Sequence, residues 1–165
     1  MTDTKPYRIE NATLRTSRPV YTKMWARFVN DFDGLALPAE GRVPLDFEHA
    51  HAEDLGFVEN IRRSGSLLLG DVVLMRRERD GVFDRASDIV DRYEAGTPYG
   101  LSIKFGWRWD GEIEFDVYDD NARAITVNGE TFDGPLNVIR KWPLLSVAVV
   151  RYGHDADAML PPLAA

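Results

Sequence analysis

The chain of 165 residues contains no cysteine. This absence excludes a disulfide framework, a zinc–thiolate site and a cysteine nucleophile, and it suits a reducing cytosol. The sequence also has no apolar run long enough to span a bilayer, and its polar first twenty residues lack the apolar core of a secretory signal. We therefore expect a soluble, intracellular protein that does not enter a membrane.

Basic residues are fewer than acidic ones, with 20 Lys and Arg against 27 Asp and Glu and a formal net charge of -7. Sequence-independent binding of nucleic acid depends on clustered Lys and Arg that meet phosphates, so we expect no direct nucleic-acid binding. Hydrophobic residues make up 44% of the chain, which is enough for the core of one ordinary domain. We expect neither a second domain nor a cofactor.

Short β-branched or aromatic segments, separated by Gly, Pro, Asp or Asn turns, dominate the middle of the chain. Such segments predict strands. They lie within residues 25–32, 43–49, 56–63, 66–75, 99–109, 112–118, 124–130, 136–142 and 144–152. A series of short strands of this kind predicts a mostly β fold, either a closed barrel or a sandwich.

One segment, residues 84–95, has a helical period instead. It begins with an Asp, Gly96 follows it as a stop signal, and its apolar residues recur at helical spacing. These apolar residues are Ala86, Ile89, Val90 and Tyr93. We therefore predict a helix packed on the outside of the β structure, and an α+β fold class that is mostly β.

The two ends of the chain differ in composition from its middle. Residues 1–24 are mostly polar and rich in Thr and Arg, which predicts an N-terminal arm or an edge strand. Residues 25–160 carry the predicted strands and the helix, and form the expected domain. Residues 161–165 are expected to be a tail.

Two histidines two residues apart, His49 and His51, follow a predicted strand and lie among several carboxylates. Residues i and i+2 of a strand share a face, so the pair can bind a metal as an HxH motif does. Only His154 adds a further imidazole, although carboxylates can complete such a site. A single histidine at the end of a strand is more often an ordinary surface residue, and we do not expect a bound metal.

Ser102 lies in a segment that alternates apolar and polar residues. Leu101, Ile103 and Phe105 point to one side of the predicted strand, while Ser102 and Lys104 point to the other, where a cleft can form. Serine needs a neighbouring base to take its proton. Ser102 is therefore a candidate nucleophile only if a base such as His49 lies beside it in space.

Four motifs follow one another along the chain. His49 is followed by Gly56, residues 100–104 read GLSIK, residues 127–136 contain VNG and GPL, and the apolar strand at 144–150 leads to a GHD turn. In this order the motifs resemble the prohead (capsid-maturation) serine protease family of tailed phages, which is distantly similar to the herpesvirus assemblins. The resemblance covers about residues 25 to 160.

The resemblance implies a distorted closed β-barrel of the prohead protease and assemblin type. It implies a serine endopeptidase in which His49 is the base and Ser102 the nucleophile, with Arg140 or Arg151 near the oxyanion. The implied substrates are the scaffold protein and the major capsid protein, cleaved inside the procapsid in the host cytoplasm. The resemblance also allows a homo-oligomer.

The third catalytic member is left open, because the chain departs from the family pattern in the last apolar strand. Ser146 stands where the family usually has Glu, and Ala148 stands where it has Ser. Lys104, on the predicted face of Ser102, also permits a Ser–Lys arrangement. The candidates for the third member are Glu114, Asp116, His51 and His154.

Two other functions compete with the serine endopeptidase. The first is a catalytically inactive, protease-like capsid-assembly module, which the loss of the family Glu at Ser146 favours and the presence of both His49 and Ser102 opposes. The second is a metal-dependent hydrolase that uses His49 and His51.

Overall fold

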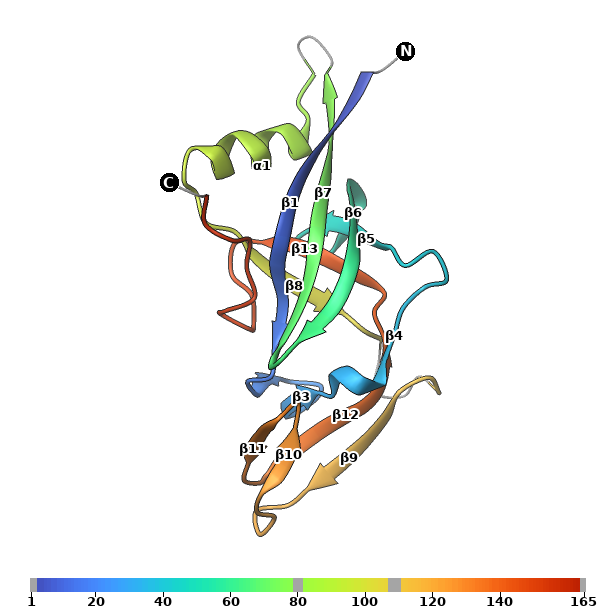
Figure 1. Cartoon of the computed structure of the whole chain (residues 1–165), viewed down its shortest axis with the longest axis vertical. Helices are drawn as coiled ribbons and strands as arrows, with labels where there is room; N and C mark the ends of the chain where they lie inside the picture. Colours follow the sequence, from blue (N-terminus) through green and yellow to red (C-terminus); the bar gives the residue numbers. More distant parts are fainter. Residues whose placement is uncertain (1–2, 79–81, 107–110, 164–165) are drawn as a thin grey trace.

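Strands dominate the computed structural model, which describes residues 3–78, 82–106 and 111–163 (Figure 1). Each segment that the sequence predicts to be β overlaps a strand of the structure. The prediction of a mostly β fold is therefore confirmed. Within the described ranges, no helix combines the length and the apolar character needed to cross a membrane.

The larger sheet has six strands in the order β1-β7-β6-β5-β13-β8. In this order they are β1 (Asp3–Thr16), β7 (Leu67–Glu78), β6 (Ala50–Ser64), β5 (Val43–Phe47), β13 (Ser146–Val150) and β8 (Gly100–Lys104). Neighbouring strands are antiparallel except β5 and β13, which run parallel. Strand β13 therefore places segments from the two halves of the chain, β5 and β8, on either side of itself.

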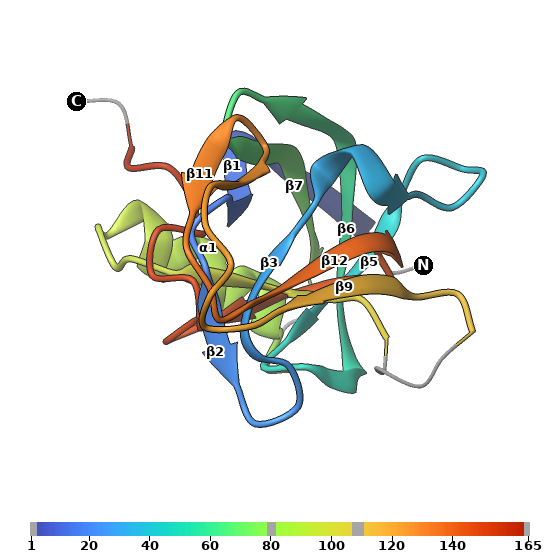
Figure 2. The same cartoon turned by 90° about the horizontal axis from the view of Figure 1, so that it is seen from below.

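The larger sheet curls so that its edge strands β1 and β8 approach each other. In the view from below, β1, β7, β6 and β5 follow one another across the molecule (Figure 2). The C-terminal segment is bonded to both edges. The backbone N–H of Thr13 donates to Met159 O at 3.1 Å, and that of Leu101 donates to Ala158 O at 2.7 Å. The described ladders do not pair β1 directly with β8, so the structure shows a curled sheet, and the closed barrel stays a prediction.

A smaller sheet lies at the other end of the molecule, around the central strand β12 (Leu136–Pro143) (Figure 1). Strand β12 pairs in parallel with β3 and β4, and antiparallel with β9, while β2 pairs with β3. These strands are β2 (Val20–Thr22), β3 (Ala26–Asn30), β4 (Leu35–Ala36) and β9 (Glu114–Tyr118), with a 3-10 turn, η1 (Phe32–Gly34), between β3 and β4.

A hairpin of β10 (Ile125–Val127) and β11 (Glu130–Phe132) accompanies the smaller sheet. Its two turn residues, Asn128 and Gly129, have φ values of 54° and 83°. A two-residue type I′ turn requires positive φ at both positions, and the Asn-Gly pair is its preferred sequence. The VNG motif at residues 127–129 thus forms this turn.

The helix predicted at residues 84–95 is present as α1 (Arg85–Glu94). The carboxylate of Asp84 accepts a hydrogen bond from Ser87 N at 3.0 Å and caps the first turn. Gly96, with a φ of 88°, follows the last turn. The apolar residues at helical spacing are buried, and the helix packs against β7 and β6.

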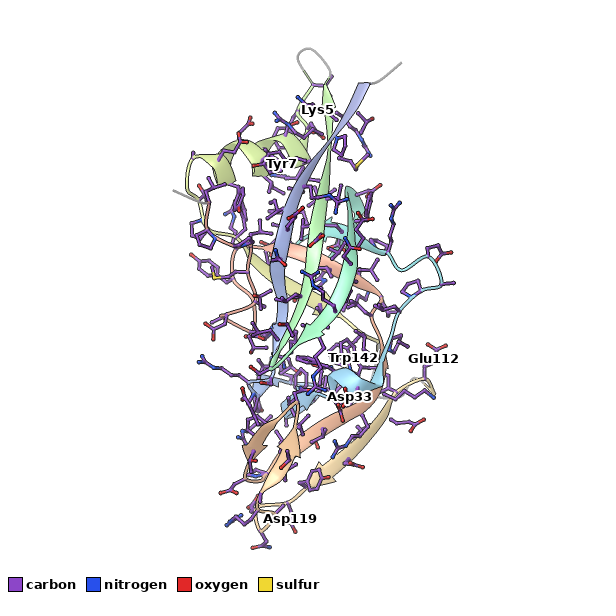
Figure 3. The ribbon with its side chains drawn as sticks, in the orientation of Figure 1. Lys5, Tyr7, Asp33, Glu112, Asp119 and Trp142 are labelled. Carbon is purple, nitrogen blue, oxygen red and sulfur yellow. The ribbon has the colours of Figure 1, made fainter. Side chains whose placement is uncertain are left out.

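Aromatic side chains join the two sheets. Trp142 of β12 is fully buried, donates from Nε1 to Asp31 O at 2.8 Å, and lies at the level where the sheets meet (Figure 3). Its ring meets that of Phe105 with centroids 5.8 Å apart, and Phe105 also contacts Trp25 at 5.9 Å. These contacts fix the residue that follows β8 against the smaller sheet.

The first and last segments of the chain belong to the same structure. Strand β1 is an edge strand whose residues Ile9, Ala12 and Leu14 are buried in the main core. Near the other end, the Tyr93 hydroxyl donates to Pro161 O at 2.6 Å. The sequence left open whether residues 1–24 form an arm or an edge strand, and the position of β1 at the edge of the larger sheet agrees with the edge strand.

Candidate active site

The Nε2 atom of His49 and the Oγ atom of Ser102 lie 2.8 Å apart, within hydrogen-bonding distance. His49 lies in the turn between β5 and β6, and Ser102 in the middle of β8. Strand β13 separates β5 from β8, so the contact spans three strands of the larger sheet. The spatial convergence that the motif order predicts for these two side chains is therefore observed, and we refer to them as the His49–Ser102 dyad.

The strand register explains why there is room for this contact. Ser102 of β8 is paired with Ala148 of β13, and Ala148 with Asp46 of β5. Paired residues on adjacent strands place their side chains on the same face. The single methyl group of Ala148 leaves space beside Ser102 on this face, which a larger side chain would fill.

The turn that carries His49 is strained. Glu48 and His49 form a two-residue loop between the paired residues Phe47 and Ala50, and their φ values are 52° and 59°. Both positions of such a type I′ loop favour Asn or Gly, because a Cβ atom in the left-handed region costs about 1–2 kcal/mol. Backbone strain of this kind clusters at functional sites.

Hydrogen bonds through Glu48 hold this turn against the end of β13. The backbone N–H of Glu48 donates to Val149 O at 3.1 Å, and its Oε1 atom accepts from Arg151 N at 3.0 Å. The turn is therefore fixed to the strand that it crosses, which limits the movement of the neighbouring imidazole.

Gly56, the glycine of the first motif, supports the same hairpin. It is paired with Leu45 of β5 and has a φ of 139°. A Cβ atom at this position would lie 2.1 Å from Val73 O. Only glycine fits there, so the motif has a steric reason in the close approach of β6 and β7.

The dyad opens on a cavity of about 330 Å³. Apolar side chains make up most of its wall: Leu14, Val20, Met24, Trp25, Phe28, Leu101, Ile103 and Phe105. His49 and Ser102 are partly exposed in this cavity, and His154, which also lines it, is exposed. A largely apolar cavity with a few polar groups is typical of a ligand site.

A buried ion pair forms another part of the cavity wall. Arg15, which is 3% exposed, donates from Nη1 to Asp155 Oδ2 at 2.8 Å and from Nε to Asn30 Oδ1 at 3.2 Å. Asp155 also accepts from Thr16 N at 2.6 Å and from the Thr16 hydroxyl. Burial lowers the pKa of Arg15, and the charge of Asp155 opposes this effect. The pair ties the C-terminal turn to β1.

Of the two histidine candidates for a third catalytic member, His154 and His51, only the side chain of His154 can be placed. His154 lines the cavity together with His49 and Ser102. The side chain of His51 lies outside the described part of the structure. In that described part, no group of three or more His, Cys, Asp or Glu side chains is arranged to hold a metal ion.

The two carboxylate candidates lie elsewhere, on β9 of the smaller sheet. Glu114 accepts from Lys141 Nζ at 3.2 Å, and Asp116 accepts from Arg140 Nε at 2.7 Å. Neither carboxylate lines the cavity, and Arg140 is further held by Asp31 at 3.0 Å. The placement supports neither Glu114 nor Asp116 as the orienting carboxylate, and it does not support Arg140 as an oxyanion donor.

The sequence reasoning missed Arg15 as a residue of the cavity. Its segment reads as a polar arm or edge strand, and burial of Arg15 arises only when β1 curls toward β8. Asp155 carried a signal, because it ends the GHD turn of the fourth motif. Pairing of this turn with the N-terminal strand has no local pattern in the sequence.

No family model, no curated protein and no solved structure matches this chain.

Proposed function

We propose that the chain is a serine endopeptidase in which His49 is the general base and Ser102 the nucleophile. The 2.8 Å contact between His49 Nε2 and Ser102 Oγ is the observation that carries this proposal. A nucleophile and a base within hydrogen-bonding distance are the minimum geometry for nucleophilic catalysis by serine. The strained turn at His49 and the cavity beside Ser102 add support from backbone conformation and from shape.

The proposed reaction is acyl transfer to the serine. His49 Nε2 takes the hydroxyl proton of Ser102 while Oγ bonds to the peptide carbonyl carbon, and His49 then protonates the leaving amine as the C–N bond breaks. Water, deprotonated by His49, attacks the acyl-enzyme, and the proton returns to Ser102 as the C–O bond breaks. This step releases the product acid and restores the free serine.

The resemblance to prohead proteases gives this chemistry a proposed setting. The substrates would be the scaffold protein and the N-terminal part of the major capsid protein, cleaved inside a procapsid in the host cytoplasm. The curled larger sheet, with the C-terminal segment bonded to both of its edges, would then correspond to the distorted closed barrel of that family.

Labelling with a serine-reactive fluorophosphonate tests the proposal directly. We expect one adduct on Ser102 by intact mass and peptide mapping, and no adduct on the Ser102→Ala variant. Ser146→Ala is the matched control, because Ser146 lies on the neighbouring strand, paired with Lys104, and should not change labelling. Cleavage of a capsid or scaffold substrate should fall on the order of 10⁴-fold in Ser102→Ala.

A catalytically inactive, protease-like assembly module is the second candidate. The position that holds Glu in the family is Ser146 here, buried at 4% exposure, and this replacement favours loss of activity. The inactive module predicts neither an adduct nor cleavage in the unchanged protein. A metal-dependent hydrolase predicts instead that His51→Ala and chelators abolish cleavage, while Ser102→Ala retains it.

A further inference from the structure

The cavity beside Ser102 lies along the outer edge of β8. Strand β8 is the last strand in the order of the larger sheet, with β13 on one side. Successive residues of a strand point to opposite faces, yet Leu101, Ser102 and Ile103 all line the cavity. A space that contacts three successive residues follows the edge of their strand. The side chain next to a bond attacked by Ser102 therefore has this cavity beside it.

Part of the apolar wall is accessible to a bound group. Val20 of β2, Met24 in the turn between β2 and β3, and Ile103 of β8 all line the cavity and are partly exposed. The same three side chains pack against the main hydrophobic core. The accessible part of the wall is therefore apolar and is held in position from behind.

Three aromatic rings support this wall. Trp25 and Phe28 have ring centroids 6.3 Å apart, and Phe105 lies 5.9 Å from Trp25 and 5.8 Å from Phe28. All three side chains are buried, and they come from the smaller sheet and from the residue that follows β8. Because these rings already contact one another, the wall is formed before a substrate binds, which lowers the cost of ordering it.

The charged residues of the wall define the rival occupant of the cavity. Arg15 and Asp155 are buried and form an ion pair at 2.8 Å, so each charge is matched by the other. Lys104 is partly exposed and His154 is exposed. An acidic side chain, drawn by these two basic groups, is therefore the alternative to an apolar one.

We propose that the cavity is the specificity pocket for one large apolar side chain, such as that of Leu or Phe, on the acyl side of the bond that Ser102 attacks. This inference rests on the proposed function of Ser102. A volume of about 330 Å³ is small for a ligand site and suits one large side chain. A smaller side chain would bury less apolar surface, and a carboxylate would lose hydration against the apolar wall.

Peptidyl diphenyl phosphonates test this inference. Ser102 Oγ bonds to phosphorus, its proton passes to His49 Nε2, and one P–O bond breaks to release phenolate, so the side chain of the probe lies next to the attacked atom. Four otherwise identical probes would carry the side chains of Leu, Phe, Ala and Glu. We expect the Leu probe, the Phe probe or both to label Ser102 on the order of 100-fold faster than the Ala and Glu probes.

Met24→Lys links the preference to the wall, because lysine is also unbranched but brings a positive charge. Each rate would be divided by the rate of a plain fluorophosphonate in the same protein. We expect the ratio of the Glu rate to the Leu rate to rise on the order of 10-fold in Met24→Lys. Tyr21→Lys is the matched control, because Tyr21 of β2 is 69% exposed, does not line the cavity, and should keep the original ratio.

Three results would overturn the inference, and they differ in what they leave standing. Equal rates for all four probes, or fastest labelling by the Ala or the Glu probe, would refute the apolar pocket while Ser102 remained the labelled nucleophile. The same ratio of Glu to Leu rates in both lysine variants would place the side chain of the probe away from Met24. Failure of the fluorophosphonate and of every phosphonate to label Ser102 would refute the proposed function, and this inference with it.

Discussion

Replacing His49 with glycine should give a more stable protein than replacing it with alanine, although both changes remove the imidazole. The reason is the backbone of the turn, in which His49 has a φ of 59°. Alanine keeps the Cβ atom that makes this conformation unfavourable, whereas glycine adopts it without that cost. The hydrogen bond to Ser102 is lost in both variants, so it cancels in the comparison.

The expected difference can be worked out from two opposing effects. Relief of the left-handed conformation is worth about 1–2 kcal/mol, and the greater freedom of glycine in the unfolded chain takes back about 0.5–1 kcal/mol. The His49→Gly variant should therefore exceed His49→Ala by about 1 kcal/mol in free energy of unfolding. For a chain of this size, that difference raises Tm by about 2–4 °C.

Urea denaturation followed by circular dichroism would measure this difference, with fluorophosphonate labelling of the same samples. Neither variant should be labelled, because each lacks the proposed base. Ala50→Gly is the control. Ala50 is the strand residue that follows the turn, and it is not among the residues with a positive φ, so a glycine at this position should lower the stability of the protein. If His49→Gly were no more stable than His49→Ala, the turn would not store the strain that we assign to it.

Two further changes test the contributions of single carboxylates to the stability of the fold. Asp84→Ala should cost about 1 kcal/mol of stability at neutral pH, because it removes the cap of α1. Burial acts to raise the pKa of Asp84, but hydrogen bonds from Arg77 N and Ser87 outweigh it and hold the pKa below its usual value. The capping contribution should therefore be complete above about pH 4 and fade as the pH falls further, which stability curves of the two proteins would show. Asp155→Ala should cost about 3–5 kcal/mol by urea denaturation, because it leaves the charge of Arg15 buried without its partner; a loss below about 1 kcal/mol would contradict the buried pair.

Local patterns predict the elements of this fold well. The helix at 84–95 follows from its apolar spacing, its Asp cap and Gly96, and each of these features acts within a few residues. The strands follow in the same way from alternation and turn residues. The smaller sheet and the curl of the larger one were not predicted, because they depend on contacts between segments far apart in the sequence.

The candidate site, like the fold, could be predicted from the sequence only in part. His49 and Ser102 were found because motifs in a fixed order imply a spatial arrangement that neither residue implies alone. The carboxylates of Glu114 and Asp116 were chosen because they share a strand face, and a strand face does not reveal which sheet the strand joins. Arg15 was not considered, because only the fold converts a surface arginine of an edge strand into a buried one.

Residues from both ends of the chain line the cavity together with residues from its middle. Strand β1 supplies Arg15, and the C-terminal turn supplies Asp155, which bonds to Arg15 and to Thr16. Immediately beyond this turn, residues 158–160 bond to β8, next to Ser102, and to β1. The part of the cavity wall that Arg15 and Asp155 form therefore needs both ends of the chain in place. The His49–Ser102 dyad and the buried pair of Arg15 and Asp155 line the same cavity only in the complete fold. Motifs that begin after residue 24 therefore identify the dyad and not Arg15.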